Sequence, residues 1–256
     1  MKKVDLVLQK QTYGIREAVR TLRTNIQFCG DDKRVIMMTS CLPGEGKSST
    51  SVELARCIAE MKKTVILVDA DMRKSVLVQR LKIGTPLKGL SHFLSGQCTL
   101  ADAIVATNIP KMHFLMSGPF APNPTELLET ERFRALIESL RKVYDYVVID
   151  CPPLGLVIDA AIIAKQSDGA VLVVESAKTK YRLAQSVKSK LEYTKVPILG
   201  VVLNKVDRGK QKGYYSKYYG KEYGKNGYGE YYGEKSGGGH SGGHSGGHSG
   251  RKRESA

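Results

Sequence analysis

The sequence of 256 residues predicts an α/β fold in which a mostly parallel central β-sheet is flanked by helices. Continuous apolar runs, typical of strands buried in a parallel sheet, alternate over residues 34–205 with segments whose apolar residues have helical spacing. Beyond residue 208 the composition changes abruptly, and residues 208–235 contain no aliphatic side chain that could build a core. We therefore expect one folded domain followed by a disordered C-terminal tail.

The order of these patterns predicts the individual elements. We expect strands at 34–39, 64–69, 111–116, 146–150, 169–175 and 197–203. Helices are expected at 15–28, 49–61, 125–140, 160–166 and 181–193, with short helical pieces within 87–105. The predicted parts of the chain are an N-terminal arm or short strand over 1–13, the folded domain over 14–207, a tyrosine-rich tail over 208–235 and a flexible Gly/His/Ser-rich segment over 236–256.

A glycine-bearing turn between the first core strand and its helix predicts a phosphate-binding loop. Successive backbone N–H groups in such a turn, together with the helix N-terminus, attract anions. Lys47 could reach the β- and γ-phosphates of ATP, and the Ser48 hydroxyl could bind Mg²⁺. Cys41 stands where the general pattern has its first glycine. The predicted nucleotide-binding residues are Pro43, Gly44, Glu45, Gly46, Lys47, Ser48 and Ser49.

Acidic residues follow two other predicted strands. Asp69 and Asp71 lie at the end of 64–69, and Asp150 closes a run of four apolar residues. The carboxyl ends of strands in an open α/β sheet lie over the ligand crevice, so these carboxylates could hold Mg²⁺ or accept a proton. Asn204, at the end of the last strand, is a weaker candidate for contacting a purine.

Charge and cysteine content limit the surroundings of the protein. The formal net charge is +15, which suggests an anionic partner. From Arg208 onward, ten Lys and Arg against four Glu give +6. The five cysteines show no C-x-x-C pair, which indicates reduced thiols in a cytosolic chain without a zinc site. No secretory signal and no apolar run long enough for a membrane span are present, so any membrane association would depend on another chain.

The tail is unusual because it is rich in tyrosine. Eight of the thirteen tyrosines fall there, among Gly, Lys and Glu. They could be phosphoacceptors, stacking groups for nucleic acid, or adhesive side chains of a low-complexity segment. The ATP site favours the first interpretation. The candidate phosphoacceptors are Tyr214, Tyr215, Tyr218, Tyr219, Tyr223, Tyr228, Tyr231 and Tyr232.

Taken together, these motifs resemble those of the bacterial tyrosine kinases of capsule and exopolysaccharide systems, which have a P-loop NTPase fold. The resemblance extends over 13–207 and again over the tail. It includes a Glu-x-x-Arg-x-x-Arg helix at 17–23, a Walker A motif at 43–48, a Walker A′ motif at 68–73, a Walker B motif at 148–150, and the segments 122–124 and 126–128.

The resemblance implies the function and its residues. It implies ATP-dependent tyrosine autophosphorylation in trans, with Lys47, Asp69, Asp71 and Asp150 as catalytic residues and Ser48, Asp71 and Asp150 as Mg²⁺ ligands. It places Glu17, Arg20 and Arg23 in the interface of a ring-like homo-oligomer. The implied partners are the cytoplasmic segment of a transmembrane polysaccharide co-polymerase adaptor, protein tyrosine substrates and an opposing tyrosine phosphatase. The expected location is the cytoplasm, with recruitment to the inner face of the membrane.

Three other functions remain open from the sequence. A partitioning or division-site ATPase of the same fold would carry a second lysine early in the loop, where this chain has Leu42. A weakly catalytic scaffold could bind ATP to set its oligomeric state while its basic tail contacts other partners. A nucleic-acid binder could use the Tyr/Lys tail, although nucleic acid is the less favoured partner.

Overall fold

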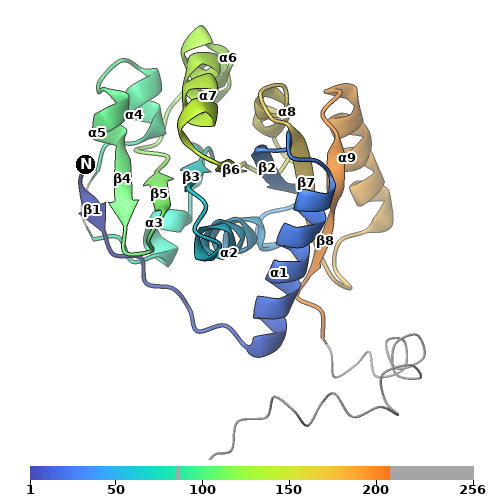
Figure 1. The fold of residues 1–256 in the computed structure, drawn as a ribbon. Coiled ribbons are helices and arrows are strands. Elements are labelled where there is room, and N and C mark those ends of the chain that lie inside the picture. Colours follow the sequence, from blue (N-terminus) through green and yellow to red (C-terminus); the bar gives the residue numbers. More distant parts are fainter. Residues whose placement is uncertain (85–86, 208–256) are drawn as a thin grey trace, which may run out of the picture. The chain divides into compact units, whose positions relative to one another are not determined.

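The computed structural model describes residues 1–84 and 87–207. Its described strands form an eight-stranded sheet in the order β1-β4-β5-β3-β6-β2-β7-β8 (Figure 1). The strands are β1 (Lys3–Val4), β2 (Val35–Ser40), β3 (Val65–Asp69), β4 (Ile104–Thr107), β5 (Met112–Leu115), β6 (Tyr146–Asp150), β7 (Gly169–Glu175) and β8 (Ile198–Asn204). Neighbouring strands are parallel except β4 and β5. The predicted fold class is confirmed.

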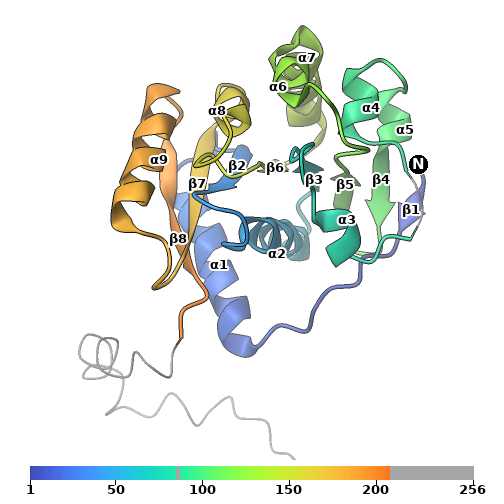
Figure 2. The same cartoon turned by 180° about the vertical axis from the view of Figure 1, so that it is seen from behind.

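Helices cover both faces of this sheet. The helices are α1 (Tyr13–Phe28), α2 (Lys47–Glu60), α3 (Leu77–Arg80), α4 (Leu90–Leu94), α5 (Leu100–Ala103), α6 (Pro124–Glu129), α7 (Glu131–Val143), α8 (Asp159–Ala164) and α9 (Tyr181–Tyr193). Figure 1 and Figure 2 show α1, α2 and α3 on one side of the sheet and α6 to α9 on the other. No helix in the described ranges is long and apolar enough to cross a membrane.

Two hydrophobic cores result, one on each face of the sheet. Side chains alternate between the faces of a strand, so Ile36 and Met38 of β2 pack toward α1 and α2, whereas Met37 packs into the core under α6 to α9. All three side chains are completely buried. Burial on both faces explains why the central strands are continuously apolar in the sequence.

The strand order determines which loops meet. β6 lies between β3 and β2, and β2 also pairs with β7. Since these strands are parallel, the segments that follow β2, β3 and β6 all leave the same edge of the sheet. We call this the carboxyl edge, and the opposite one, where these strands begin, the amino edge.

Two predicted elements need correction. The helix expected over 125–140 is interrupted at Thr130, whose backbone is extended and whose hydroxyl accepts a hydrogen bond from the backbone N–H of Phe133. Thr130 therefore caps α7 instead of continuing α6. Within 87–105 the expected helical pieces are present as α4 and α5, but the chain then enters β4, a strand that the sequence does not predict and that pairs antiparallel with β5. The calls that fall on 208–256, including the tail tyrosines, lie outside the described residues.

Candidate functional site

The predicted phosphate loop lies between β2 and α2 at the carboxyl edge. Gly46 immediately precedes α2 and has φ +100°, a left-handed conformation that side chains rarely adopt. A Cβ atom there would also lie 1.9 Å from the amide nitrogen of Asn204. Lys47 and Ser48 are the first residues of α2, so the loop directs the N–H groups of the helix end toward any bound anion.

The Glu45 side chain forms hydrogen bonds within the phosphate loop itself. Its carboxylate accepts hydrogen bonds from the backbone N–H groups of Cys41 (2.7 Å) and Leu42 (2.9 Å), and it also contacts the Thr179 hydroxyl. Asn204 donates from its amide to the Glu45 carbonyl oxygen at 2.9 Å. Glu45 and Asn204, both predicted to bind nucleotide, therefore hold the shape of the loop in this structure. Pro43 and Gly44 are exposed at its tip.

Cys41, which stands in place of the usual first glycine, is completely buried. Burial, together with the nearby Glu45 charge, raises the pKa of its thiol to about 11. A Cβ atom on Gly155, in the segment after β6, would lie 2.0 Å from the Cys41 carbonyl oxygen. The start of the loop is therefore packed tightly against that segment, and the Cys41 side chain is part of the core.

Lys47 brings the predicted carboxylates together. Its ammonium group lies 3.2 Å from an oxygen of Asp71 and 3.6 Å from an oxygen of Asp150, and it donates to the Ser48 hydroxyl at 3.3 Å. Burial lowers the pKa of Lys47, but Asp150, Asp71 and Asp69 together raise it above its usual value. Lys47 therefore remains a cation that neutralises a buried acidic cluster.

Asp69 is the carboxyl group whose pKa is raised to about 7. Complete burial is the main cause, and the neighbouring Asp150 charge adds to it, whereas the contact with the Ser75 hydroxyl acts in the opposite direction. Burial also raises the pKa of Asp150, although Lys47 opposes that change. Burial therefore favours the protonated form of both carboxyl groups, and Asp69 is close to the point of protonation near neutral pH.

Some residues of the site were missed in the sequence. Ser51 donates its hydroxyl to Asp150 at 3.1 Å, and it lies four residues after Lys47 on the same face of α2, so helical spacing could have identified it. Arg73 forms an ion pair with Asp159, the first residue of α8. Predicted Ser49 is contacted by a guanidinium nitrogen of Arg80 in α3.

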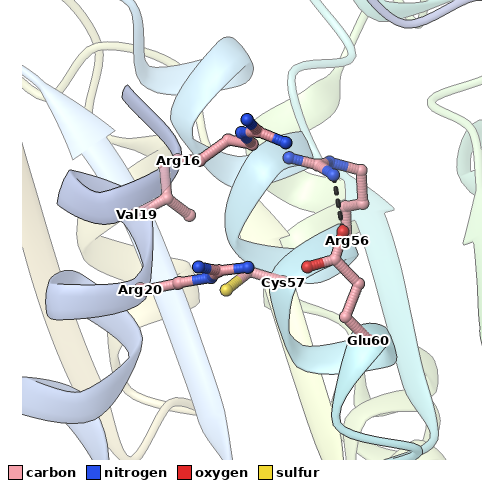
Figure 3. Close-up of a pocket in the computed structure, with 6 residues that line it drawn as sticks. All are labelled: Arg16, Val19, Arg20, Arg56, Cys57 and Glu60. Carbon is pink, nitrogen blue, oxygen red and sulfur yellow. Dashed lines mark hydrogen bonds and ion pairs between the residues drawn. The ribbon is translucent and has the colours of Figure 1, made fainter. Parts of the chain in front are cut away.

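The predicted interface residues lie elsewhere, on α1. Glu17 and Arg20 pair with each other at 2.6 Å and are exposed. Arg23 instead turns toward α2, with its guanidinium group 3.5 Å from the carbonyl oxygen and the sulfur of Cys57. Between α1 and α2 lies a cavity of about 160 Å³ (Figure 3). Its lining consists of Arg16, Val19, Arg20, Arg56, Cys57 and Glu60.

Comparisons with known proteins agree with this architecture. A family model described as an AAA domain matches residues 33–191. Tyrosine-protein kinase CpsD of Streptococcus agalactiae is 40% identical over 209 residues, which cover 81% of this chain and 91% of that relative. The kinase domain of the Escherichia coli tyrosine kinase ETK superposes with a TM-score of 0.70 at 30% identity, over 75% of this chain and 77% of that one.

A more distant likeness comes from another class of protein. The septum site-determining protein MinD of Pyrococcus horikoshii, complexed with Mg-ADP, has a TM-score of 0.60 and 27% identity, over 68% of this chain and 71% of that one. It shares the fold, whereas the tyrosine-protein kinases match over more of the chain and at higher identity. The chain therefore belongs to the bacterial tyrosine kinase family, the protein-tyrosine kinases built on a phosphate-loop fold.

Proposed function

We propose that this chain is an ATP-dependent kinase that phosphorylates the tail tyrosines of another copy of itself within a ring-like oligomer. We further propose that it regulates the synthesis or export of a capsular polysaccharide or exopolysaccharide. The observation that carries the proposal is the contact of Lys47, at the start of the phosphate-loop helix, with Asp71 and Asp150, beside a buried Asp69. The kinase relatives and the tyrosine cluster of the tail support the choice of tyrosine as acceptor.

The loop fits a nucleoside triphosphate. The left-handed Gly46 and the free end of α2 form an anion cradle, and Lys47 adds a cation next to it. The ion pairs of Lys47 with Asp71 and Asp150 must loosen for its ammonium group to contact phosphate oxygens. The Mg-ADP complex of the related MinD protein supports a magnesium nucleotide as the ligand.

The donor atoms around Lys47 fit Mg²⁺ bound together with a nucleotide. The Ser48 hydroxyl and carboxylate oxygens of Asp71 and Asp150 are hard oxygen ligands of the kind Mg²⁺ prefers. The described residues contain no cluster of three or more His, Cys, Asp or Glu side chains that could hold a metal alone, as expected for an ion that takes much of its coordination from phosphates and water. When bound, Mg²⁺ supplies positive charge to the transferring γ-phosphoryl group.

The acidic pair Asp69 and Asp71 fits the role of general base. A base works best when its pKa is close to the operating pH, and the pKa of Asp69 is about 7. Asp71 is more accessible than the fully buried Asp69, and its backbone N–H donates to an Asp69 carboxylate oxygen at 3.3 Å. In this proposal the pair accepts the proton of the acceptor tyrosine hydroxyl.

The α1 surface fits the proposed self-association. Glu17 and Arg20 are exposed, so their mutual ion pair can be exchanged for contacts with a neighbouring copy. Arg23 packs against Cys57 of α2 and would support the interface from behind by holding α1 in place. We propose that phosphorylation reverses the positive charge of the tail and loosens the oligomer, which light scattering would detect as a fall in mass.

The remaining partners are proposed from the family resemblance. They are the cytoplasmic segment of a transmembrane polysaccharide co-polymerase adaptor, other protein tyrosine substrates and an opposing phosphatase. In this proposal the chain is cytoplasmic and the adaptor recruits it to the inner face of the membrane. Its positive charge would favour that surface, which carries anionic lipids.

A mixing assay with Mg²⁺ and ATP tests the proposed function. The enzyme is the chain truncated after Arg208, and the acceptor is the full chain carrying Lys47→Met, with folding of both checked by circular dichroism. Phosphotyrosine is measured with and without the cytoplasmic segment of a candidate adaptor. We expect phosphate on the Lys47→Met tail. Absence of phosphotyrosine in both conditions, despite measured ATP binding, would reject the kinase and favour an ATP-gated scaffold or a partitioning-type ATPase.

A further inference from the structure

Arg73, Asp159 and Thr125 form a closed cluster of hydrogen bonds at the carboxyl edge. The Arg73 guanidinium group contacts both carboxylate oxygens of Asp159, through Nε at 2.7 Å and Nη2 at 2.9 Å. The Thr125 hydroxyl accepts a hydrogen bond from Arg73 Nη2 at 2.8 Å and donates to Asp159 Oδ1 at 3.0 Å. Asp159 is only 1% exposed. Contact with both oxygens of a buried carboxylate fixes the orientation of the arginine side chain and also compensates its charge.

The cluster joins three segments that are far apart in the sequence. Arg73 lies in the turn after β3, Asp159 opens α8 in the segment after β6, and Thr125 lies in α6. The site carboxylate Asp71 lies two residues after the end of β3, and Asp150 is the last residue of β6. The ion pair is therefore a direct side-chain link between the two acidic segments of the site.

The turn that contains Arg73 also sets the direction of Asp71. The backbone N–H of Lys74 donates to Asp71 Oδ1 at 3.0 Å, which leaves Asp71 Oδ2 facing the Lys47 ammonium group at 3.2 Å. Arg73 lies between Asp71 and Lys74 in the chain. Fixing the Arg73 side chain on Asp159 thus fixes the turn, and with it the oxygen that Asp71 presents to the site.

The charges around Arg73 also favour this arrangement. Arg73 donates its hydrogen bonds to the Asp159 carboxylate, and the Asp71 carboxylate adds a smaller attraction of the same sign. Arg73 and Asp71 therefore attract each other across the turn. Because Asp159 occupies the guanidinium group, Asp71 remains directed at Lys47.

We propose that Arg73 and Asp159 are positioning residues of the kinase, which hold the Asp71 carboxylate in the place where it contacts Lys47 and, in the loaded enzyme, the magnesium nucleotide. This inference rests on the proposed function. Neither residue contacts the substrate in this proposal. Their effect passes through the turn at 71–74 and the segment before α8.

The chain offers a matched control at the amino edge. Arg141 of α7 contacts both carboxylate oxygens of Asp168 at 2.7 Å, and Asp168 lies immediately before β7. As in the pair of Arg73 and Asp159, an arginine contacts both oxygens of an aspartate, here through the single nitrogen Nη1, but this pair lies where the strands begin. It should stabilise the fold without affecting the site.

The experiment compares Arg73→Ala, Arg73→Lys, Asp159→Asn and the double variant Arg73→Ala/Asp159→Asn with Arg141→Ala and Asp168→Asn, all in the full chain. Four quantities are measured: kcat for phosphorylation of a size-tagged Lys47→Met chain, the dissociation constant of a fluorescent ADP with Mg²⁺, the same constant in EDTA, and the melting temperature. The ratio of the two dissociation constants reports the magnesium-dependent part of binding and needs no catalysis.

We expect Arg73→Ala and Asp159→Asn to lower kcat and to weaken the Mg²⁺-dependent part of ADP binding by about 10–100-fold, the usual effect of removing groups that orient metal ligands. ADP binding in EDTA should change less than about twofold, because the phosphate loop is intact. Arg73→Lys should be intermediate because lysine cannot contact both oxygens in a fixed fork. The double variant should be no worse than the single ones, since they remove one interaction.

Two results would overturn the inference. One is that kcat and the Mg²⁺-dependent ratio stay within about twofold of the unmodified chain in both single variants. The other is that they fall only in proportion to melting temperature, as in the Arg141→Ala and Asp168→Asn controls. If the unmodified chain produces no phosphotyrosine, the proposed function fails, and the binding ratio still decides whether the ion pair positions Asp71.

Discussion

The two edges of the central sheet use aspartates in opposite ways. At the amino edge, Asp168 accepts hydrogen bonds from the backbone N–H groups of Arg34 (3.0 Å) and Val35 (2.7 Å) as well as from Arg141. Asp145 accepts from the backbone N–H and the hydroxyl of Thr64, at 2.7 and 2.8 Å. These hydrogen bonds fix the beginnings of the strands, and those from Thr64 also favour the charged form of Asp145.

At the carboxyl edge, three carboxyl groups share the Lys47 ammonium group. Asp69 and Asp150 are buried, and burial raises the pKa of both. Ionised carboxylates held this close in a dry site destabilise the fold, and a protein tolerates that cost mainly where it serves a function. The difference teaches that a partly exposed aspartate with its own donors serves the fold, whereas aspartates buried together around one shared cation mark a functional site.

The largest effect should come from removing the shared cation. Lys47→Met should reduce phosphotyrosine formation by at least about 10²–10³-fold, since it removes a preorganised charge from the transferring group. It should also lower the free energy of unfolding by about 2–4 kcal/mol at pH 8, because buried carboxylates lose their partner. Part of that loss should disappear at pH 6 as the carboxyl groups take up protons. Urea unfolding at the two pH values measures this, and equal losses at both would contradict the shared-cation description.

Asp69→Asn should separate function from stability. We expect kcat to fall by about 10²–10⁴-fold if Asp69 accepts the tyrosine proton. The free energy of unfolding at pH 8 should rise by roughly 1–3 kcal/mol, because a buried ionised carboxylate is removed.

The raised pKa of Asp69 determines how the stability of the fold changes with pH. Its pKa is about 7 in the folded chain against an ordinary value of 3.8, so the folded state binds the proton more tightly and stability falls as the pH rises between those values. The advantage of Asp69→Asn should therefore be largest at pH 8 and vanish near pH 4. Urea titrations across that range measure it, and an advantage independent of pH would contradict the assignment.

Much of this organisation could be predicted from the sequence, because it depends on local patterns. The apolar runs of β2, β3 and β6 predict buried strands, and Gly46, Lys47 and Ser48 after one of them predict a phosphate loop. These signals lie within a few residues of one another. The same is true of the break at Thr130, where a residue with strong capping preference was overlooked.

The remaining features depend on contacts between distant residues. Arg73 and Asp159 are 86 positions apart, and their pairing depends on β3 and β6 being neighbours, which no spacing in the sequence specifies. The position of Asn204 at the end of a strand predicts a nucleotide contact. Only the structure shows that its amide also donates a hydrogen bond to the Glu45 carbonyl oxygen and so stabilises the loop. Residue types and strand ends predict the candidates for a site, and only the strand order shows which of them meet.

Asp168→Asn should have the reverse effect of Asp69→Asn. The amide has no charge and only one acceptor oxygen, so it cannot serve both Arg141 and the backbone donors of Arg34 and Val35. We expect a loss of about 1–3 kcal/mol in the free energy of unfolding. Phosphotyrosine formation per folded molecule should stay within about twofold, since the residue lies at the amino edge. Thermal unfolding and the mixing assay measure the two quantities, and a specific loss of kcat would show that the edges are coupled.

The smallest effect should come from Asp145→Asn. Its hydrogen bonds with Thr64 lower the pKa of Asp145, but the side chain is 39% exposed, so solvent screening limits the loss to about 0.5 kcal/mol. A lowered folded-state pKa means that this stabilisation is present above the ordinary value of 3.8 and is lost as the pH falls through the folded value. The wild type and Asp145→Asn should therefore differ at pH 5 and converge below pH 3. If Asp145→Asn were instead more stable than the wild type at pH 5 and this advantage vanished on acidification, Asp145 would resemble Asp69, and the contrast between the two edges would fail.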